Sequence, residues 1–174
     1  MTEPVRDTID LPGGTLALLR WPAPDRPRLV FAHANGFCAS AYTQMLGRLA
    51  GRFDIAAMDL RGHGRTTLPA DPAAHTGWDI YADDIAAACA RMDRPPDLMA
   101  GHSMGAASSL MAAARMDAAP RLALVEPVVL PALLYAAYAT PLRVLIRKRI
   151  GLGDLARKRT NGWPDRAAAA ARYR

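Results

Sequence analysis

A serine between two glycines carries the most chemical information in this sequence. Residues 101–105 read Gly-His-Ser-Met-Gly, directly after the apolar run 98–100 and before a segment of small residues typical of a helix. In a strand–turn–helix context this pattern is a nucleophile elbow, whose glycines let the two backbones approach closely. The turn lifts the Ser103 hydroxyl above the sheet, and the Met104 N–H at the helix N-terminus points into the same space. We therefore predict Ser103 as a nucleophile and Met104 as an oxyanion-hole donor.

The other members of a catalytic triad are incomplete in the sequence. A serine hydroxyl is a weak nucleophile, so it needs a histidine to take its proton and an acid to orient that histidine. All four histidines precede the serine: His33, His63, His75 and His102. Glu126, at the end of a later apolar run, is the one internal candidate for the acid, although a Glu-Pro pair suits the end of a strand equally well. Both interpretations of Glu126 stay open at this point.

The elements that must position these residues alternate along the chain. Two segments separated by a Pro-Gly-Gly turn, 5–11 and 15–21, predict a β-hairpin. Four short apolar runs predict strands at 29–32, 55–58, 98–100 and 122–125. Three helical patterns lie at 41–49, 80–92 and 106–116, the second with Asp83 and Asp84 in early turns, where the helix dipole favours acids. Strands alternating with helices in this way are typical of a parallel α/β sheet.

Composition and charge narrow the class of protein further. With 174 residues and 51% hydrophobic composition, the chain can bury one substantial core. Ten of its 22 Lys and Arg residues fall in 142–174, so the net charge of +6 indicates a basic tail and not a nucleic-acid interface. Cys38 and Cys89 provide neither a disulfide scaffold nor a thiolate zinc site. The N-terminal residues lack the apolar run of an export signal, which predicts a cytoplasmic protein.

One segment has to be tested as a membrane span. Residues 122–142 are nearly free of charge and have about the length that a bilayer requires. Glu126 and three prolines argue against a spanning helix, since a charge at the membrane centre is costly. We therefore expect a strand, a loop and the start of an apolar helix, with no stable membrane insertion.

Together with the serine motif, three further segments resemble the α/β-hydrolase superfamily. Residues 31–37 are similar to its His-Gly oxyanion loop, 59–64 to its Asp-x-Arg-Gly-x-Gly loop, and 81–85 to the helix before the elbow strand. Ala106 and Thr66 depart from common family residues without touching the chemistry. The resemblance implies a mostly parallel α/β-hydrolase sheet with flanking helices, truncated after the sixth strand. Residues 1–130 would then be the N-terminal part of the core, and 131–174 the start of a helical cap.

The resemblance also implies roles for particular residues. The second oxyanion donor would be the Phe37 N–H, or the Asn35 N–H in an alternative alignment, while His33 and His63 would brace the loops by hydrogen bonds. Family members carry their acid and then their histidine after the nucleophile, so we expect this chain to be a fragment without the catalytic histidine. Asp59 and His63 do not share a helix face, and we predict neither a metal nor a cofactor.

These features predict a serine hydrolase that cleaves a carboxylic ester with an apolar group. The apolar group would pack on the cap segment 142–155, whose apolar residues recur at helical spacing. The alternative is an inactive fragment, or a binding module that uses the basic tail. In either case the apolar run 122–125 should form an unpaired sheet edge, through which the chain would self-associate.

Overall fold

The structure is a computed structural model. It describes residues 3–71, 77–129, 133, 136–137, 140 and 163–172. The chain divides into two compact units, 1–129 and 130–174. In the second unit helix α7 (Arg166–Arg172) contains a run of alanines, and Asp165 Oδ1 accepts the Ala168 N–H at 2.8 Å. His75, the predicted cap segment 142–155 and most of the basic tail lie outside the described residues.

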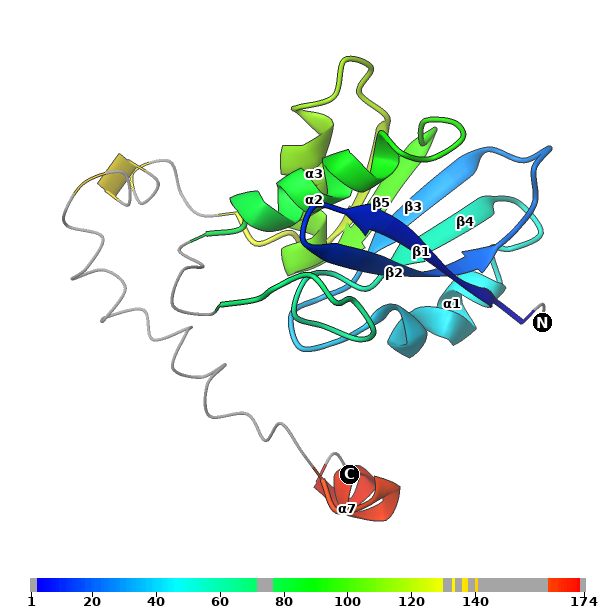
Figure 1. Cartoon of the computed structure of the whole chain (residues 1–174), viewed down its shortest axis with the longest axis vertical. Coiled ribbons are helices and arrows are strands. Elements are labelled where there is room, and N and C mark those ends of the chain that lie inside the picture. The colour runs from blue at the N-terminus through cyan, green and yellow to red at the C-terminus, as the bar shows by residue number, and fades with distance from the viewer. Residues whose placement is uncertain are drawn as a thin grey trace. The chain divides into compact units, whose positions relative to one another are not determined.

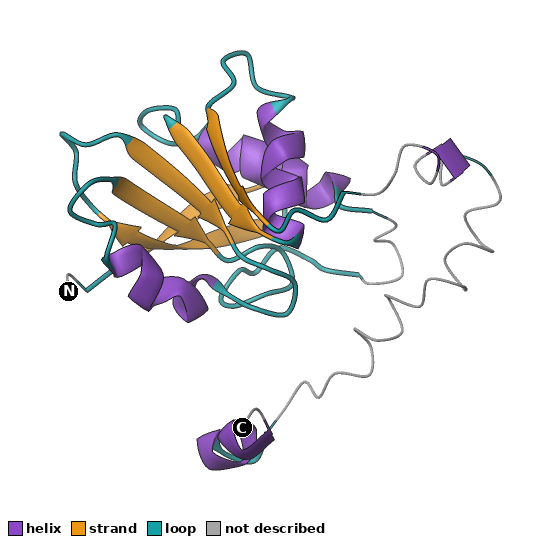
Figure 2. Cartoon of the chain, turned by 180° about the vertical axis from the view of Figure 1, so that it is seen from behind, coloured by secondary structure: helices purple, strands orange, loops and turns teal. Residues whose placement is uncertain are grey.

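A six-stranded sheet forms the first unit (Figures 1 and 2). Its order is β1-β2-β4-β3-β5-β6; β1, β2 and β4 pair antiparallel, and β4, β3, β5 and β6 pair parallel. The predicted hairpin and all four predicted runs are confirmed as strands. The strands are β1 (Val5–Leu11), β2 (Gly14–Trp21), β3 (Arg28–Ala32), β4 (Asp54–Met58), β5 (Leu98–His102) and β6 (Arg121–Val125).

Helices cover both faces of this sheet, which explains why its central strands are buried along their whole length. Every residue of β3 and β4 is buried, as expected for strands with a layer on each side. On one face Val30 packs in a cluster with Ile85 of α2 and Ala112 of α3. On the other face Phe31 packs with Leu46 of α1. The helical elements are η1 (Ala39–Tyr42), α1 (Thr43–Gly47), α2 (Asp79–Cys89) and α3 (Met104–Ala113).

The helices differ from the sequence prediction in two instructive places. The predicted helix 106–116 begins at Met104, because the turn at Ser103 leads directly into it. In α2 the acid in the first turn is Asp79, whereas the predicted Asp84 is buried and pairs with Arg61 at 2.7 Å. Asp84 therefore ties α2 to the loop after β4 instead of interacting with the helix dipole.

Strand β6 ends the sheet at an exposed edge. Among the described residues it pairs only with β5, and the side chains of Leu122 and Val125 are exposed. The predicted unpaired edge is confirmed. No helix in the described part of the chain combines the length and apolarity needed to cross a bilayer.

A buried ionic network holds the N-terminal ends of the parallel strands. Arg28 at the start of β3 donates from Nε and Nη2 to Asp54 Oδ2 at the start of β4, at 2.9 and 2.6 Å. Arg94 donates to the same oxygen at 2.8 Å, and Asp93 accepts from Arg28 Nη1 at 2.6 Å. Burial opposes ionisation of Asp54, but the hydrogen bonds from Arg28 and Arg94 hold its pKa below the usual value.

Candidate active site

The backbone of Ser103 has the strained conformation expected of a nucleophile elbow. Its φ of 54° and ψ of −114° lie where residues with a side chain are rarely found. The Ser103 N–H donates to the Val125 carbonyl at 2.9 Å, and its carbonyl accepts the Ala107 N–H at 3.1 Å. Strand β6 and helix α3 therefore fix the turn from both sides.

The two glycines of the motif are required by close backbone contacts. A Cβ at Gly101 would lie 2.5 Å from the Gly105 carbonyl, and one at Gly105 would lie 2.3 Å from the Ala32 oxygen. Neither distance is compatible with a real side chain. The glycines thus let α3 pack against the ends of β3 and β5, as the motif predicted.

The loop after β3 turns sharply at residues 34–37. The Phe37 N–H donates to the Ala34 carbonyl at 3.1 Å, and Gly36 has a φ of 77°. The predicted Phe37 donor is therefore used within this turn, and it would have to share or leave that bond to reach a substrate oxygen. Asn35, the alternative donor, lies at the outer part of the turn, with its Oδ1 at 3.3 Å from His63 Nε2.

His33 connects the loop after β3 to the loop after β4 by hydrogen bonds. Its Nδ1–H donates to the Ala34 carbonyl at 2.8 Å, and its Nε2 accepts the Leu60 N–H at 2.9 Å. Burial lowers the pKa of His33 to about 4, a shift that the bond to Ala34 only partly offsets. His33 is thus a neutral structural link between two loops, as predicted.

His63 makes the corresponding link from the second loop. Its Nδ1–H donates to the Arg61 carbonyl at 2.9 Å, and its Nε2 accepts the Gly36 N–H at 3.1 Å. The His33 and His63 rings lie edge to face with centroids 4.9 Å apart. The predicted bracing role of His63 is therefore confirmed as well.

Asp59 organises the loop that carries His63. Its Oδ1 accepts the Ala39 N–H at 2.7 Å, and its Oδ2 accepts the Arg65 N–H at 2.9 Å. A Cβ at Gly64 would fall within the Asp59 carboxylate, so the loop can close over the carboxylate only with glycine there. Sequence reasoning recognised this motif but did not predict the partners of Asp59, one of which lies in the same loop and the other 20 positions earlier in the chain.

The structure brings Glu126 next to His102 at the elbow. Glu126 Oε2 lies 3.7 Å from His102 Nε2, and Glu126 has a φ of 47° in the turn that ends β6. The other ring nitrogen of His102 lies 2.8 Å from the Tyr42 hydroxyl. Sequence reasoning missed Tyr42, because nothing in the spacing of the helical segment 41–49 distinguishes it.

The described histidines are all engaged by other groups. Both ring nitrogens of His33, His63 and His102 have the partners given above, and none of these partners is Ser103. In the described ranges no group of three His, Cys, Asp or Glu side chains is placed to hold a metal ion. Among the described residues the site therefore consists of a positioned serine at the start of α3 and a nearby carboxylate.

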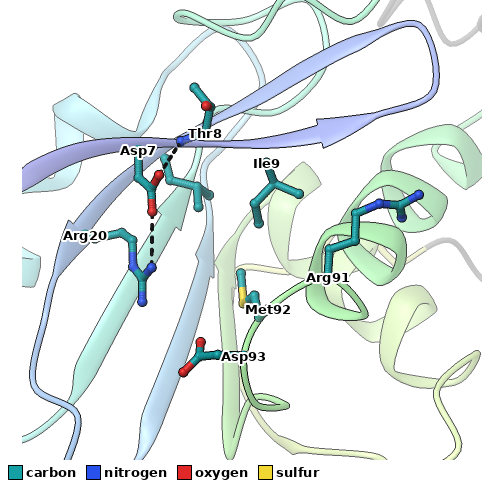
Figure 3. Close-up of a pocket in the computed structure, with 8 residues that line it drawn as sticks. Asp7, Thr8, Ile9, Arg20, Arg91, Met92 and Asp93 are labelled. Atoms are coloured by element: carbon teal, nitrogen blue, oxygen red, sulfur yellow. Dashed lines mark hydrogen bonds and ion pairs between the residues drawn. The ribbon is translucent and has the colours of Figure 1, made fainter.

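A separate polar cavity of about 340 Å³ lies between the β1–β2 hairpin and the loop after α2 (Figure 3). Two ion pairs lie at this cavity: Arg20 with Asp7 at 3.1 Å, and Asp93 with Arg28 at 2.6 Å. None of the residues that line the cavity belongs to the elbow or to the loops after β3 and β4, so it is separate from the candidate site.

The strand order and the strained serine between β5 and α3 define an α/β hydrolase. A model of the alpha/beta hydrolase family matches residues 29–174, so the chain belongs to that family. A curated relative, 2-(acetamidomethylene)succinate hydrolase from Mesorhizobium japonicum, is 35% identical over 91 residues, which is 51% of this chain and 31% of the relative. The matched region thus spans about a third of that relative's length.

Solved structures give the same picture of the fold. A hypothetical protein from Pseudomonas aeruginosa PAO1 is similar with a TM-score of 0.68 and 26% identity, over 98% of this chain and 59% of that one. N-formylmaleamic acid deformylase from Pseudomonas putida S16 is similar with a TM-score of 0.61 and 26% identity, over 71% of this chain and 47% of that one. A thioesterase domain from the curacin biosynthetic pathway has a TM-score of 0.69 at 23% identity, over 99% of this chain and 62% of that one.

Proposed function

We propose that Ser103 is the nucleophile of a hydrolase that cleaves a carboxylic ester with an apolar group. The observation that carries this proposal is the conformation of Ser103, held between β5 and α3 at a positive φ. A folded protein retains such strain where the surrounding structure enforces it, most often at functional sites. A non-catalytic turn at this place would be relaxed by glycine.

The reaction would proceed through an acyl-enzyme. The Ser103 oxygen forms a bond to the ester carbonyl carbon, the alcohol leaves with a proton, and water then releases the acid and regenerates the serine. The Met104 N–H at the start of α3 supports the negative charge on the carbonyl oxygen. The second donor would come from the loop 33–37, through the amide of Phe37 or Asn35.

The proposed acid is Glu126, which lies beside the elbow and is exposed to solvent. The Glu126 carboxylate is exposed at the end of β6 and lies 3.7 Å from His102 Nε2, so to orient a catalytic imidazole it would turn from that ring. No histidine follows Ser103 in the 174 residues. The base that completes turnover is therefore the missing member of this proposed site.

A second candidate reaction is the cleavage of an N-acyl bond. Both 2-(acetamidomethylene)succinate and N-formylmaleamic acid carry an acyl group on nitrogen, and they name the substrates of two relatives of this chain. An amide nitrogen leaves as an amine only after it is protonated, so this reaction depends more strongly on a general acid than ester cleavage does. Anilide substrates would separate the two candidates.

The direct test is acylation of Ser103 in the 174-residue chain. The protein is incubated with p-nitrophenyl acetate, butyrate and hexanoate, with the matching p-nitroanilides, and with a fluorophosphonate, and the adducts are mapped by peptide mass spectrometry. We expect adducts on the peptide containing Ser103, formed faster from esters than from anilides but slowly in both cases, because acylation needs a base and no histidine follows Ser103 in the 174 residues. Turnover should stay low for the same reason, since deacylation needs that base as well.

Ser103→Ala is the matched control, because it removes the nucleophile and leaves the turn in place. Labelling that persists in this variant, or that falls equally on Ser40 and Ser108, would contradict the proposal. Preferential acylation by anilides would favour the second candidate.

A further inference from the structure

The side chain of Tyr42 contacts both walls of the candidate site. Its hydroxyl oxygen accepts the Ala34 N–H at 3.2 Å and lies 2.8 Å from His102 Nδ1. Ala34 belongs to the loop that carries the predicted oxyanion donor, and His102 directly precedes the nucleophile. One hydroxyl therefore bridges two segments that are 68 positions apart in the sequence.

Packing against three other rings also holds the Tyr42 side chain in place. Its centroid lies 4.8 Å from that of Phe31, 6.1 Å from Phe37 and 6.0 Å from His102. These rings come from β3, from the loop after it and from β5. The turn η1 that carries Tyr42 is itself anchored, since the Ala39 N–H donates to Asp59 at 2.7 Å.

The Glu126 carboxylate sets the direction of the bond between Tyr42 and His102. Its Oε2 lies 3.7 Å from His102 Nε2 and favours a proton on that nitrogen, which leaves Nδ1 as an acceptor. The Tyr42 hydroxyl then donates its hydrogen to Nδ1 while its oxygen accepts the Ala34 N–H. The hydrogen bonds thus run from the loop through Tyr42 to His102.

We propose that Tyr42 is a positioning residue of this site, which bridges Ala34 and His102 and so sets the separation of the oxyanion loop from the nucleophile elbow. The inference rests on the proposed function of Ser103. In this role Tyr42 acts through the two segments it joins. An oxyanion donor displaced by about 1 Å from its productive position costs a large part of the rate, so a link of this kind affects reactivity more than stability.

The test is Tyr42→Phe, which keeps the ring and removes the bridge. We expect hydrogen exchange of the Ala34 amide to become about tenfold faster, since one buried hydrogen bond is lost. The His102 nitrogen shifts should move from a single Nε2–H tautomer toward a mixture of the two. Labelling of Ser103 by a fluorophosphonate should slow about tenfold, with a melting temperature close to that of the unchanged protein.

Three further variants serve as controls. Thr8→Val removes a hydroxyl in β1, which three strands separate from β5, and should leave all three readouts unchanged. His102→Asn retains a side-chain acceptor near the position of Nδ1 and should preserve the protection of Ala34 better than His102→Ala, which identifies the bridge even if Tyr42→Phe does not fold.

The outcomes separate this inference from the proposed function. Unchanged Ala34 exchange and unchanged His102 shifts in Tyr42→Phe would overturn the bridging role. Ser103 labelling that is equally fast in Tyr42→Phe and in the unchanged protein would overturn the positioning role. If Ser103 is unreactive in every variant, the proposed function fails and the positioning role fails with it, while exchange and tautomer still decide whether Tyr42 bridges the two segments.

Discussion

Acidification from pH 7 to pH 5 should destabilise the fold mainly through one buried side chain. The pKa of His33 is lowered from 6.5 to about 4 by burial, so in this pH range the folded ring stays neutral while the unfolded ring binds a proton. The unfolded state therefore binds more protons, and stability falls as the pH falls from 6.5 toward 4. Above pH 7 both states are neutral, and the effect of His33 disappears.

The magnitude follows from the two pKa values. One pKa unit corresponds to about 1.4 kcal/mol, so the free energy of unfolding should drop by about 2 kcal/mol between pH 7 and pH 5. The full loss below pH 4 would be about 3 kcal/mol. Against a total stability of about 5 to 15 kcal/mol for a typical domain, this change is easily measured.

Urea denaturation at pH 7, 6 and 5 measures the effect, with His33→Gln as the comparison. Glutamine retains a hydrogen-bonding group and does not titrate, so this variant should be less stable at pH 7 but should lose about 2 kcal/mol less on acidification. Equal losses in the two proteins, or an NMR titration of His33 centred near pH 6.5, would refute the reasoning.

Three substitutions should change stability in opposite directions. Ser103→Gly should raise the free energy of unfolding by about 1 kcal/mol, because relief of backbone strain exceeds the entropy cost of glycine; a urea midpoint no higher than that of Ser103→Ala would contradict this. Gly105→Ala should cost about 3 kcal/mol because its Cβ meets the Ala32 carbonyl, whereas Gly51→Ala, in open space, should be nearly neutral in the same assay. Asp54→Asn should lower stability by about 3 kcal/mol, and thermal unfolding should show a much smaller loss for the exposed partner in Asp93→Asn.

The elbow and the strands could be predicted from the sequence because their signals are local. Short apolar runs between helical patterns predict strands, although the run in β6 is exposed because it lies at the edge of the described sheet. The strand–turn–helix context makes the glycines around Ser103 informative. The strand order of the sheet is a tertiary property that these local signals did not predict.

The remaining contacts of the site depend on residues that are distant in sequence. Tyr42 looks like an ordinary helix residue until the fold brings it to His102, and Asp84 looks like a helix-dipole acid until Arg61 reaches it. The partner of Glu126 likewise depends on the parallel pairing of β5 with β6. Such contacts have no period or spacing by which a single sequence could reveal them.

The bond from the Ser103 amide to the Val125 carbonyl links the nucleophile to the outermost strand of the sheet. Sheet edges open locally at far lower free energy than the core, since few contacts hold them. Fraying of β6 would thus free the backbone of the most strained residue in the site while β3 and β4 stay folded. The turn at Ser103 consequently depends on an edge strand of the described sheet, and any molecule or segment that pairs with β6 would also rigidify that turn.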